Sequence, residues 1–215
     1  SGPFVNFSSA MGVLDMPFLF ANNEEAYKVL DGEIGKELLG TLEDADLKGL
    51  AYAERGFRNI TNSKKPITNA ADVAGLKLRV MENDVYTATF KALGVNAVPM
   101  AWSDALTALQ QGTIDGMENP IATLYGQAYY EVAKYITMID YIRMPVQWIT
   151  SESWFQSLTE EQQQIICEAG DEAGLFNNQK QDEMLEQYIS DMQANGVEVI
   201  TPDDVEMARF KEAAL

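Results

Sequence analysis

The sequence predicts an α/β fold in which helices alternate with apolar strands. Two observations carry this prediction. Short apolar segments of strand character are separated by segments with helical spacing, and glycines end several of these helical segments. In addition, 215 residues with 47% hydrophobic residues can bury a sizeable core, and no repeat, low-complexity segment or linker divides the chain. We therefore expect parallel βα units in one body, which could be bilobal.

The N-terminal part predicts a helix followed by strands. Asn22 is a suitable helix cap with acidic residues after it. Behind it an apolar residue recurs every four positions, which predicts one continuous helix carrying Ala26, Leu30, Ile34, Leu38 and Leu42 on one stripe. Two strands are expected on either side of Gly56, at 47–52 and 57–61.

The middle of the chain alternates most regularly. Its expected elements, in order, are a helical turn at 70–73, a strand at 76–80, a helix at 84–93, a strand at 96–100, a helix capped by Ser103 and ending at 111, and a strand at 113–117. Gly75, Gly94 and Gly112 follow the three helical segments, as helix-ending glycines do.

The pattern changes after Tyr135. Residues 135–139 and 142–149 are expected to form a long β-rich stretch with Pro145 inside it, and Thr159 with Gln162 resembles a capping box. The helix that begins there is predicted to run to about residue 195, with Gly170 and Gly174 bending it.

Charge and composition exclude several classes of function. The net charge is −18, which argues against nucleic acid and anionic membrane surfaces as partners. No apolar run is long enough to span a bilayer. Histidine is absent and Cys167 is the one cysteine, which excludes Ser-His-Asp and Cys-His catalysis, histidine-bearing zinc sites, iron–sulfur clusters and internal disulfides. We expect no metal and no cofactor.

Arg79 and Asn119 are the strongest candidates for binding residues. Arg79 ends a strand in the βα series, where ligands of open α/β sheets bind, and its guanidinium matches a carboxylate bidentately. The alternative is a salt bridge to one of the 33 acidic residues. Asn119 lies at a strand-to-helix turn before Pro120, where an amide also serves as a cap or turn former.

Two further residues belong to this candidate site. Trp102 occupies an exposed-looking position for a large ring, with ordinary packing as the alternative. Arg58 is a second candidate cation, with a surface arginine as the alternative. Three carboxylates, Asp104, Asp115 and Glu118, could form an acid/base pair or a magnesium cluster, although their spacing favours solvated or capping roles.

Taken together, the chain resembles the solute-binding proteins of tripartite ATP-independent periplasmic (TRAP) transporters. The order and spacing of many short motifs carry the resemblance over nearly the whole chain. These motifs are 14–20, 56–60, 66–67, 72–80, 92–94, 98–100, 108–120, 130–135 and 154–158.

The resemblance implies a bilobal fold like that of periplasmic binding proteins, with two sheets flanked by helices, hinge strands and a long helix spanning both lobes. Lobe I would comprise 1–55 and 145–184, and lobe II 56–144 and 185–215. Family members carry an N-terminal βαβ portion before the point matching Ser1, so we expect this portion to be missing and a sheet edge, if exposed, to be open to pairing with another chain.

The resemblance also implies a function without chemistry. The protein would be a periplasmic or otherwise extracytoplasmic receptor that captures a small organic acid, closes its lobes about a hinge and delivers the acid to membrane permease subunits. Arg79 would bind the carboxylate with help from Asn119, Trp102 would line the cleft, and Arg58 would lie nearby. The family's frequent Thr-x-His is replaced by Ile139-Asp140-Tyr141, so contacts from that segment stay open.

The sequence favours a monocarboxylate, such as a sugar acid or a branched or aromatic acid, over succinate or malate, because a dicarboxylate needs a second cation and Trp102 offers an apolar face. Two other functions remain as alternatives. One is a carboxylate-dependent hydrolase using Asp104, Asp115 and Glu118, and the other is a ligand-sensing module of the same fold.

Overall fold

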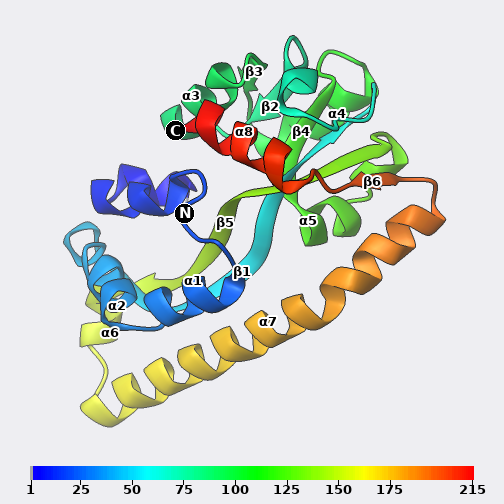
Figure 1. Cartoon of the computed structure of the whole chain (residues 1–215). Coiled ribbons are helices and arrows are strands. Elements are labelled where there is room, and N and C mark those ends of the chain that lie inside the picture. Colours follow the sequence, from blue (N-terminus) through cyan, green and yellow to red (C-terminus); the bar gives the residue numbers. More distant parts are fainter. Residues whose placement is uncertain (1) are drawn as a thin grey trace. The chain divides into compact units, whose positions relative to one another are not determined.

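The computed structural model describes residues 2–215, and the packing of the chain divides it into two compact units. Unit 1 comprises Ser1–Gly56 and Arg143–Glu183, and unit 2 comprises Phe57–Ile142 and Met184–Leu215. These bounds lie within two residues of those expected for the lobes; that the units are the lobes of a receptor stays a prediction. Three elements belong to both units, namely strands β1 and β5 and the long helix α7 (Figure 1).

The secondary structure is mixed α/β. The strands are β1 (Leu47–Asn62), β2 (Lys77–Val80), β3 (Asn96–Pro99), β4 (Gly116–Pro120), β5 (Tyr135–Ser151) and β6 (Glu198–Ile200). The α-helices are α1 (Asn23–Leu30), α2 (Glu33–Gly40), α3 (Asp84–Ala92), α4 (Trp102–Gln110), α5 (Ile121–Gly126), α6 (Glu152–Gln156), α7 (Glu160–Ala194) and α8 (Asp204–Ala214). Short 3-10 helices are η1 (Gly2–Asn6), η2 (Ser9–Asp15), η3 (Glu43–Ala45), η4 (Ala70–Val73) and η5 (Tyr129–Glu131). Within residues 2–215, no helix is both long and apolar enough to cross a membrane.

The six strands form one sheet in the order β3-β2-β4-β1-β5-β6. The α/β prediction is confirmed, but the expected division into two sheets is not what the strand pairing gives. The reason is the length of β1 and β5, which have 16 and 17 residues and belong to both units. β1 was predicted as two shorter strands, whereas β5 was predicted as one long β-rich stretch. Gly56 lies inside β1 with a φ of +90°, a conformation that suits glycine and does not end the strand.

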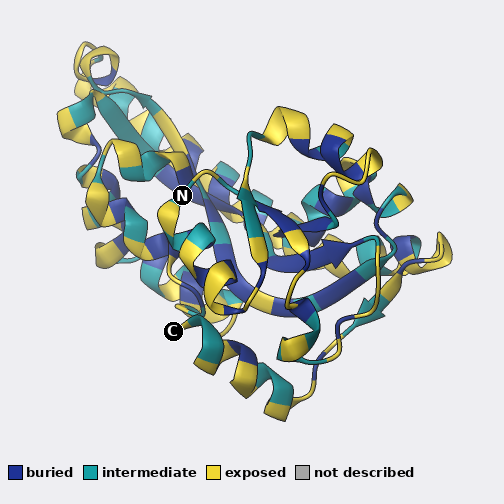
Figure 2. Ribbon diagram, turned by 90° about the horizontal axis from the view of Figure 1, so that it is seen from above, coloured by how far each residue is buried: buried dark blue, intermediate teal, exposed yellow. Residues whose placement is uncertain are grey.

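Unit 2 contains the predicted βα series β2-α3-β3-α4-β4. β2 pairs in parallel with both β3 and β4, whereas β1 is antiparallel to β4. Strands β2 and β4 are largely buried, β3 is partly exposed, and the helices expose their outer faces (Figure 2). One face of these strands packs against α4, α5 and the C-terminal part of α7 in a core that includes Ala105, Ala108, Leu109, Met117, Ile121, Leu124, Tyr129 and Met192.

Two boundaries around α4 differ from the prediction. Trp102 is the first residue of α4 and Ala101 its cap residue, while the Ser103 hydroxyl bonds to Asp104 at 3.2 Å instead of capping the helix. The strand expected at 113–117 begins at Gly116, because the backbone N–H groups of Thr113 and Ile114 turn back to the carbonyl of Ala108.

Unit 1 shows where helical spacing alone was misleading. Asn22 caps α1, its side chain accepting from Glu25 N at 2.8 Å as predicted. The apolar stripe is nevertheless split between α1 and α2, since Gly32 caps a new helix and Ile34 is 58% exposed. Leu30 and Leu42 of the stripe do enter the core of this unit, and Leu38 packs against it.

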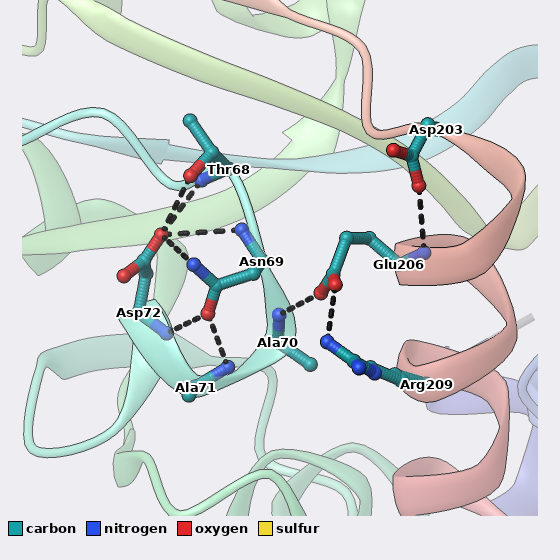
Figure 3. A network of polar contacts seen from close by, with 8 residues as sticks. All are labelled: Thr68, Asn69, Ala70, Ala71, Asp72, Asp203, Glu206 and Arg209. Atoms are coloured by element: carbon teal, nitrogen blue, oxygen red, sulfur yellow. Dashed lines mark hydrogen bonds and ion pairs between the residues drawn. The ribbon is translucent and has the colours of Figure 1, made fainter.

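In unit 2, the C-terminal helix α8 is attached to η4 by a polar network (Figure 3). Asn69 and Asp72 form a reciprocal capping box around the first turn of η4. Glu206 of α8 accepts from Ala70 N at 3.3 Å and pairs with Arg209, while Asp203 caps α8 through Glu206 N. The helical turn predicted at 70–73 is thus confirmed.

A buried ion pair joins β1 and β5 within unit 1. Arg143 Nη2 lies 2.8 Å from Glu54 Oε2, and both side chains are almost fully buried. The Tyr27 hydroxyl donates to Glu54 Oε1 at 2.5 Å, and the Arg143 guanidinium lies 4.9 Å from the centroid of the Tyr27 ring. Burial raises the pKa of Glu54, against the opposing effect of Arg143. The pair therefore ties α1, β1 and β5 together.

The predicted capping box at the start of α7 is confirmed, because Thr159 and Gln162 bond reciprocally at 3.0 and 3.3 Å. Further along α7, Gly174 permits close packing on β1. A Cβ at Gly174 would lie 2.6 Å from the carbonyl oxygen of Tyr52, which is backbone and cannot move aside cheaply.

We predict that Gly174→Ala destabilises the protein by about 1–3 kcal/mol, as overpacking does, although alanine is the better helix former. Chemical denaturation would measure the change. Gly40→Ala is the matched control, since Gly40 ends α2 and a Cβ there would meet nothing within 4 Å. Equal stability changes in the two variants would contradict the close-packing explanation.

Candidate functional site

All residues of the candidate site belong to unit 2. Arg79 lies near the end of β2, between Val98 of β3 and Met117 of β4 in the parallel registers. It is only 4% exposed, and its Nε donates to the Met100 carbonyl oxygen at 2.9 Å. Among residues 2–215, neither terminal nitrogen of its guanidinium has a hydrogen bond or a carboxylate partner. The salt bridge left open by the sequence is therefore not formed in the described part of the chain.

Burial lowers the pKa of Arg79, and the Glu118 carboxylate acts in the opposite direction. An arginine keeps its proton despite such a shift. The result is a nearly buried cation whose Nη1 and Nη2 edge has no protein partner within the described residues. A carboxylate fits that edge with two parallel hydrogen bonds.

Trp102 lies beside this cation. Its ring centroid is 5.7 Å from Arg79 Cζ, and the ring is 41% exposed because it begins α4 and does not enter the core. Trp102 also packs against Tyr129, with the two ring centroids 5.3 Å apart. Trp102 thus borders Arg79 and offers a partly exposed aromatic surface to a ligand.

Asn119 is on the same face of the sheet as Arg79. Arg79 pairs with Met117, and Asn119 is two residues further along β4, so the alternation of side chains puts the two polar residues on one face. Asn119 is 4% exposed, and its side chain does not cap α5, whose cap residue is Pro120. Its Oδ1 accepts from Arg58 Nη2 at 3.3 Å.

Arg58 is buried in an ion pair with Glu118, so it is not the surface arginine that the sequence left as an alternative. Arg58 Nε bonds to Glu118 Oε2, and Nη2 bonds to Oε1 and to the backbone oxygen, both at 2.9 Å. Tyr141 donates to the same carboxylate at 2.5 Å. Burial lowers the pKa of Arg58, but the combined effect of Glu118, Tyr86 and Tyr141 raises it overall. The positive charge of Arg58 is thereby compensated within the protein.

The topology brings the site residues together. Successive connections run from β2 to β3 and then back across β2 to β4, so the direction of winding reverses beside β2. Open α/β sheets bind ligands at the carboxyl ends of strands beside such a reversal. Arg79 and Asn119 lie near the carboxyl ends of β2 and β4, and Trp102 follows the end of β3.

The three carboxylates considered for hydrolysis have separate partners. Asp104 is exposed on α4, Asp115 accepts from Lys77 N at 2.9 Å, and Glu118 bonds to Arg58. Within the described residues, no group of three potential metal-ligating side chains could hold an ion.

A family model described as bacterial extracellular solute-binding protein, family 7, matches residues 1–215. The chain belongs to this family. The 2,3-diketo-L-gulonate-binding periplasmic protein YiaO of Escherichia coli is 36% identical over 213 residues, which are 99% of this chain and 64% of the relative. The chain thus spans less than two thirds of the length of this family member.

Solved structures of TRAP periplasmic solute-binding proteins have the same fold. A TRAP periplasmic solute-binding protein from Sulfitobacter sp. NAS-14.1, with bound β-D-galacturonate, superimposes with a TM-score of 0.95 at 32% identity, covering 100% of this chain and 70% of that one. Another from Polaromonas sp. JS666, bound to D-erythronate, gives 0.94 at 36% identity, covering 99% and 70%. The resemblance to TRAP solute-binding proteins is therefore confirmed.

Tyr129 was not predicted as a member of the site. It follows the predicted strands, in η5, and the sequence places it only in a stretch of tyrosines. Its contact with Trp102 joins two segments 27 positions apart, and no local pattern signals such a contact.

Proposed function

We propose that this protein is the extracytoplasmic solute receptor of a TRAP transporter. It captures a small organic acid and delivers it to membrane permease subunits. One observation carries the proposal. The Nη1 and Nη2 edge of Arg79 lacks a protein partner among residues 2–215, although the side chain is nearly buried. A cation in that state is suited to an anionic ligand.

In this proposal Arg79 binds the solute carboxylate, Asn119 assists with its amide, and Trp102 covers the body of the solute. Arg58 orients the Asn119 amide. Its bond to Glu118 holds the guanidinium in place, and its bond to Asn119 Oδ1 fixes the amide. Units 1 and 2 would be the two lobes. The protein performs no chemistry on the solute.

We further propose that the solute is a hydroxylated monocarboxylate, such as a sugar acid. A dicarboxylate needs a second uncompensated cation, and in unit 2 the nearest candidate, Arg58, is neutralised by Glu118. The sugar acids bound by the relatives from Sulfitobacter and Polaromonas support this class.

A thermal-shift screen of the full-length gene product would test the proposal. We expect sugar acids to raise the melting temperature, because a ligand that binds only the folded state stabilises it by mass action. Succinate and malate should give smaller shifts. Each acid should be recovered unchanged, and its consumption would support the hydrolase alternative. The absence of a shift from every carboxylate would contradict the receptor function.

A further inference from the structure

Tyr129 carries the clearest unexplained polar group near the site. Its side chain is 2% exposed, and buried tyrosines normally hydrogen-bond their hydroxyl groups. Tyr52 donates to the Gly35 carbonyl oxygen and Tyr141 donates to Glu118, as expected. In contrast, the Tyr129 hydroxyl has no hydrogen-bond partner among residues 2–215, and it is not sealed away from solvent.

The position of Tyr129 relates it to the carboxylate site proposed at Arg79. Tyr129 and Arg79 both lie against Trp102, at 5.3 Å between ring centroids and 5.7 Å from Cζ to the centroid. Burial raises the pKa of Tyr129. The positive charge of Arg79 opposes this rise, which is consistent with Tyr129 lying near Arg79. At neutral pH the hydroxyl therefore keeps its proton and is available as a donor.

Tyr129 and a solute carboxylate held by Arg79 would lie beside the same Trp102 ring. Arg79 Nε is occupied by the Met100 carbonyl, so the carboxylate meets the other edge of the guanidinium with both of its oxygens. The next atom of the solute that can accept a hydrogen bond is an oxygen on the adjacent carbon.

We propose that the Tyr129 hydroxyl donates a hydrogen bond to an oxygen on the carbon next to the solute carboxylate, so that the site selects 2-oxygenated acids. The inference rests on the proposed function and narrows its substrate class. The acids named for the relatives have such an oxygen: a hydroxyl in erythronate, a ring oxygen in galacturonate and a keto group in 2,3-diketo-L-gulonate.

Calorimetry with a matched pair of acids tests the inference on the full-length gene product. D-Erythronate and 3,4-dihydroxybutanoate differ only in the hydroxyl next to the carboxylate. We expect Tyr129→Phe to weaken erythronate binding about 3- to 10-fold, as the loss of one hydrogen bond does, and to leave 3,4-dihydroxybutanoate within about twofold. Tyr130→Phe is the control, because Tyr130 stacks on Tyr125 and, among the described residues, makes no ring contact with Trp102 and no cation–π contact or hydrogen bond with Arg79.

The outcomes separate this inference from the proposed function. If the unmodified protein binds both acids and Tyr129→Phe weakens them equally or not at all, the role of Tyr129 is overturned and the receptor function stands. If neither these acids nor any other carboxylate binds the unmodified protein, both fail together. Unchanged thermal unfolding of ligand-free Tyr129→Phe would show that a selective loss of erythronate affinity is not a folding defect.

Discussion

Replacing Arg79 with lysine is expected to weaken binding of the solute by at least about 100-fold. Charge-assisted hydrogen bonds contribute about 1.5–3 kcal/mol each, and each 1.4 kcal/mol is about one decade in affinity. Lysine keeps the charge but loses the planar fork, and it cannot hold the Met100 carbonyl and both carboxylate oxygens in the same arrangement. Titration calorimetry with the acid that gives the largest thermal shift would measure the loss.

Arg209→Lys is the matched control for this experiment. Arg209 lies on α8 with its side chain 62% exposed and pairs only with Glu206 within the described residues, so the same chemical change there should leave affinity unaltered. An Arg79→Lys variant that retains full affinity would refute bidentate recognition of the carboxylate.

Replacing Glu118 with leucine is expected to destabilise the protein by about 3–5 kcal/mol, because removing one partner of a buried ion pair leaves the other charge uncompensated. Glu118 is 0% exposed and accepts bonds from both Arg58 and Tyr141. Denaturant unfolding would measure the change. Glu43→Leu removes the carboxylate from a partly exposed pair with Lys48 at 2.7 Å and should cost less than about 1 kcal/mol.

A double variant distinguishes an uncompensated charge from lost packing. Arg58→Met combined with Glu118→Leu should be more stable than Glu118→Leu alone, since an apolar pair of similar volume needs no counter-charge. If the double variant is less stable than the single one, the buried charge is not the cause of the loss.

Local signals predicted the βα series of unit 2 well. Glycine at the end of a helical segment and alternating apolar strands are short-range features, and Gly75, Gly94 and Gly112 all take positive φ where the segments end. Asn22 and Thr159 also cap the helices that the sequence assigned to them. These features involve neighbours within four residues, which a sequence displays directly.

Errors arose where distant packing decides the structure. The four-residue stripe from Ala26 to Leu42 predicted one helix, but Gly32 allows the chain to start a second one, whose Gly35 backbone is packed against Leu30. Likewise, β1 was predicted as two strands but is one continuous strand of 16 residues within the sheet. Sequence spacing does not contain this information.

The same limit applies to the site. Arg79 and Asn119 could be selected from their positions at strand ends and from the resemblance to TRAP solute-binding proteins. The partner of Arg58 could not, since Glu118 is 60 positions away and is one of 33 acidic residues. Tyr129 was missed because a sequence does not show whether a tyrosine hydroxyl has a hydrogen-bond partner in the folded protein.

The bond between Arg79 and the main-chain oxygen of Met100 has an evolutionary consequence. A backbone carbonyl is present whatever residue is encoded at position 100, so drift at that codon cannot delete the group that orients the arginine. If Arg79 binds the solute carboxylate as proposed, the side chain at position 100 can change without removing the group that orients this arginine. For redesign as a biosensor, libraries would vary Trp102 and Tyr129 and leave the strand that carries Arg79 unchanged.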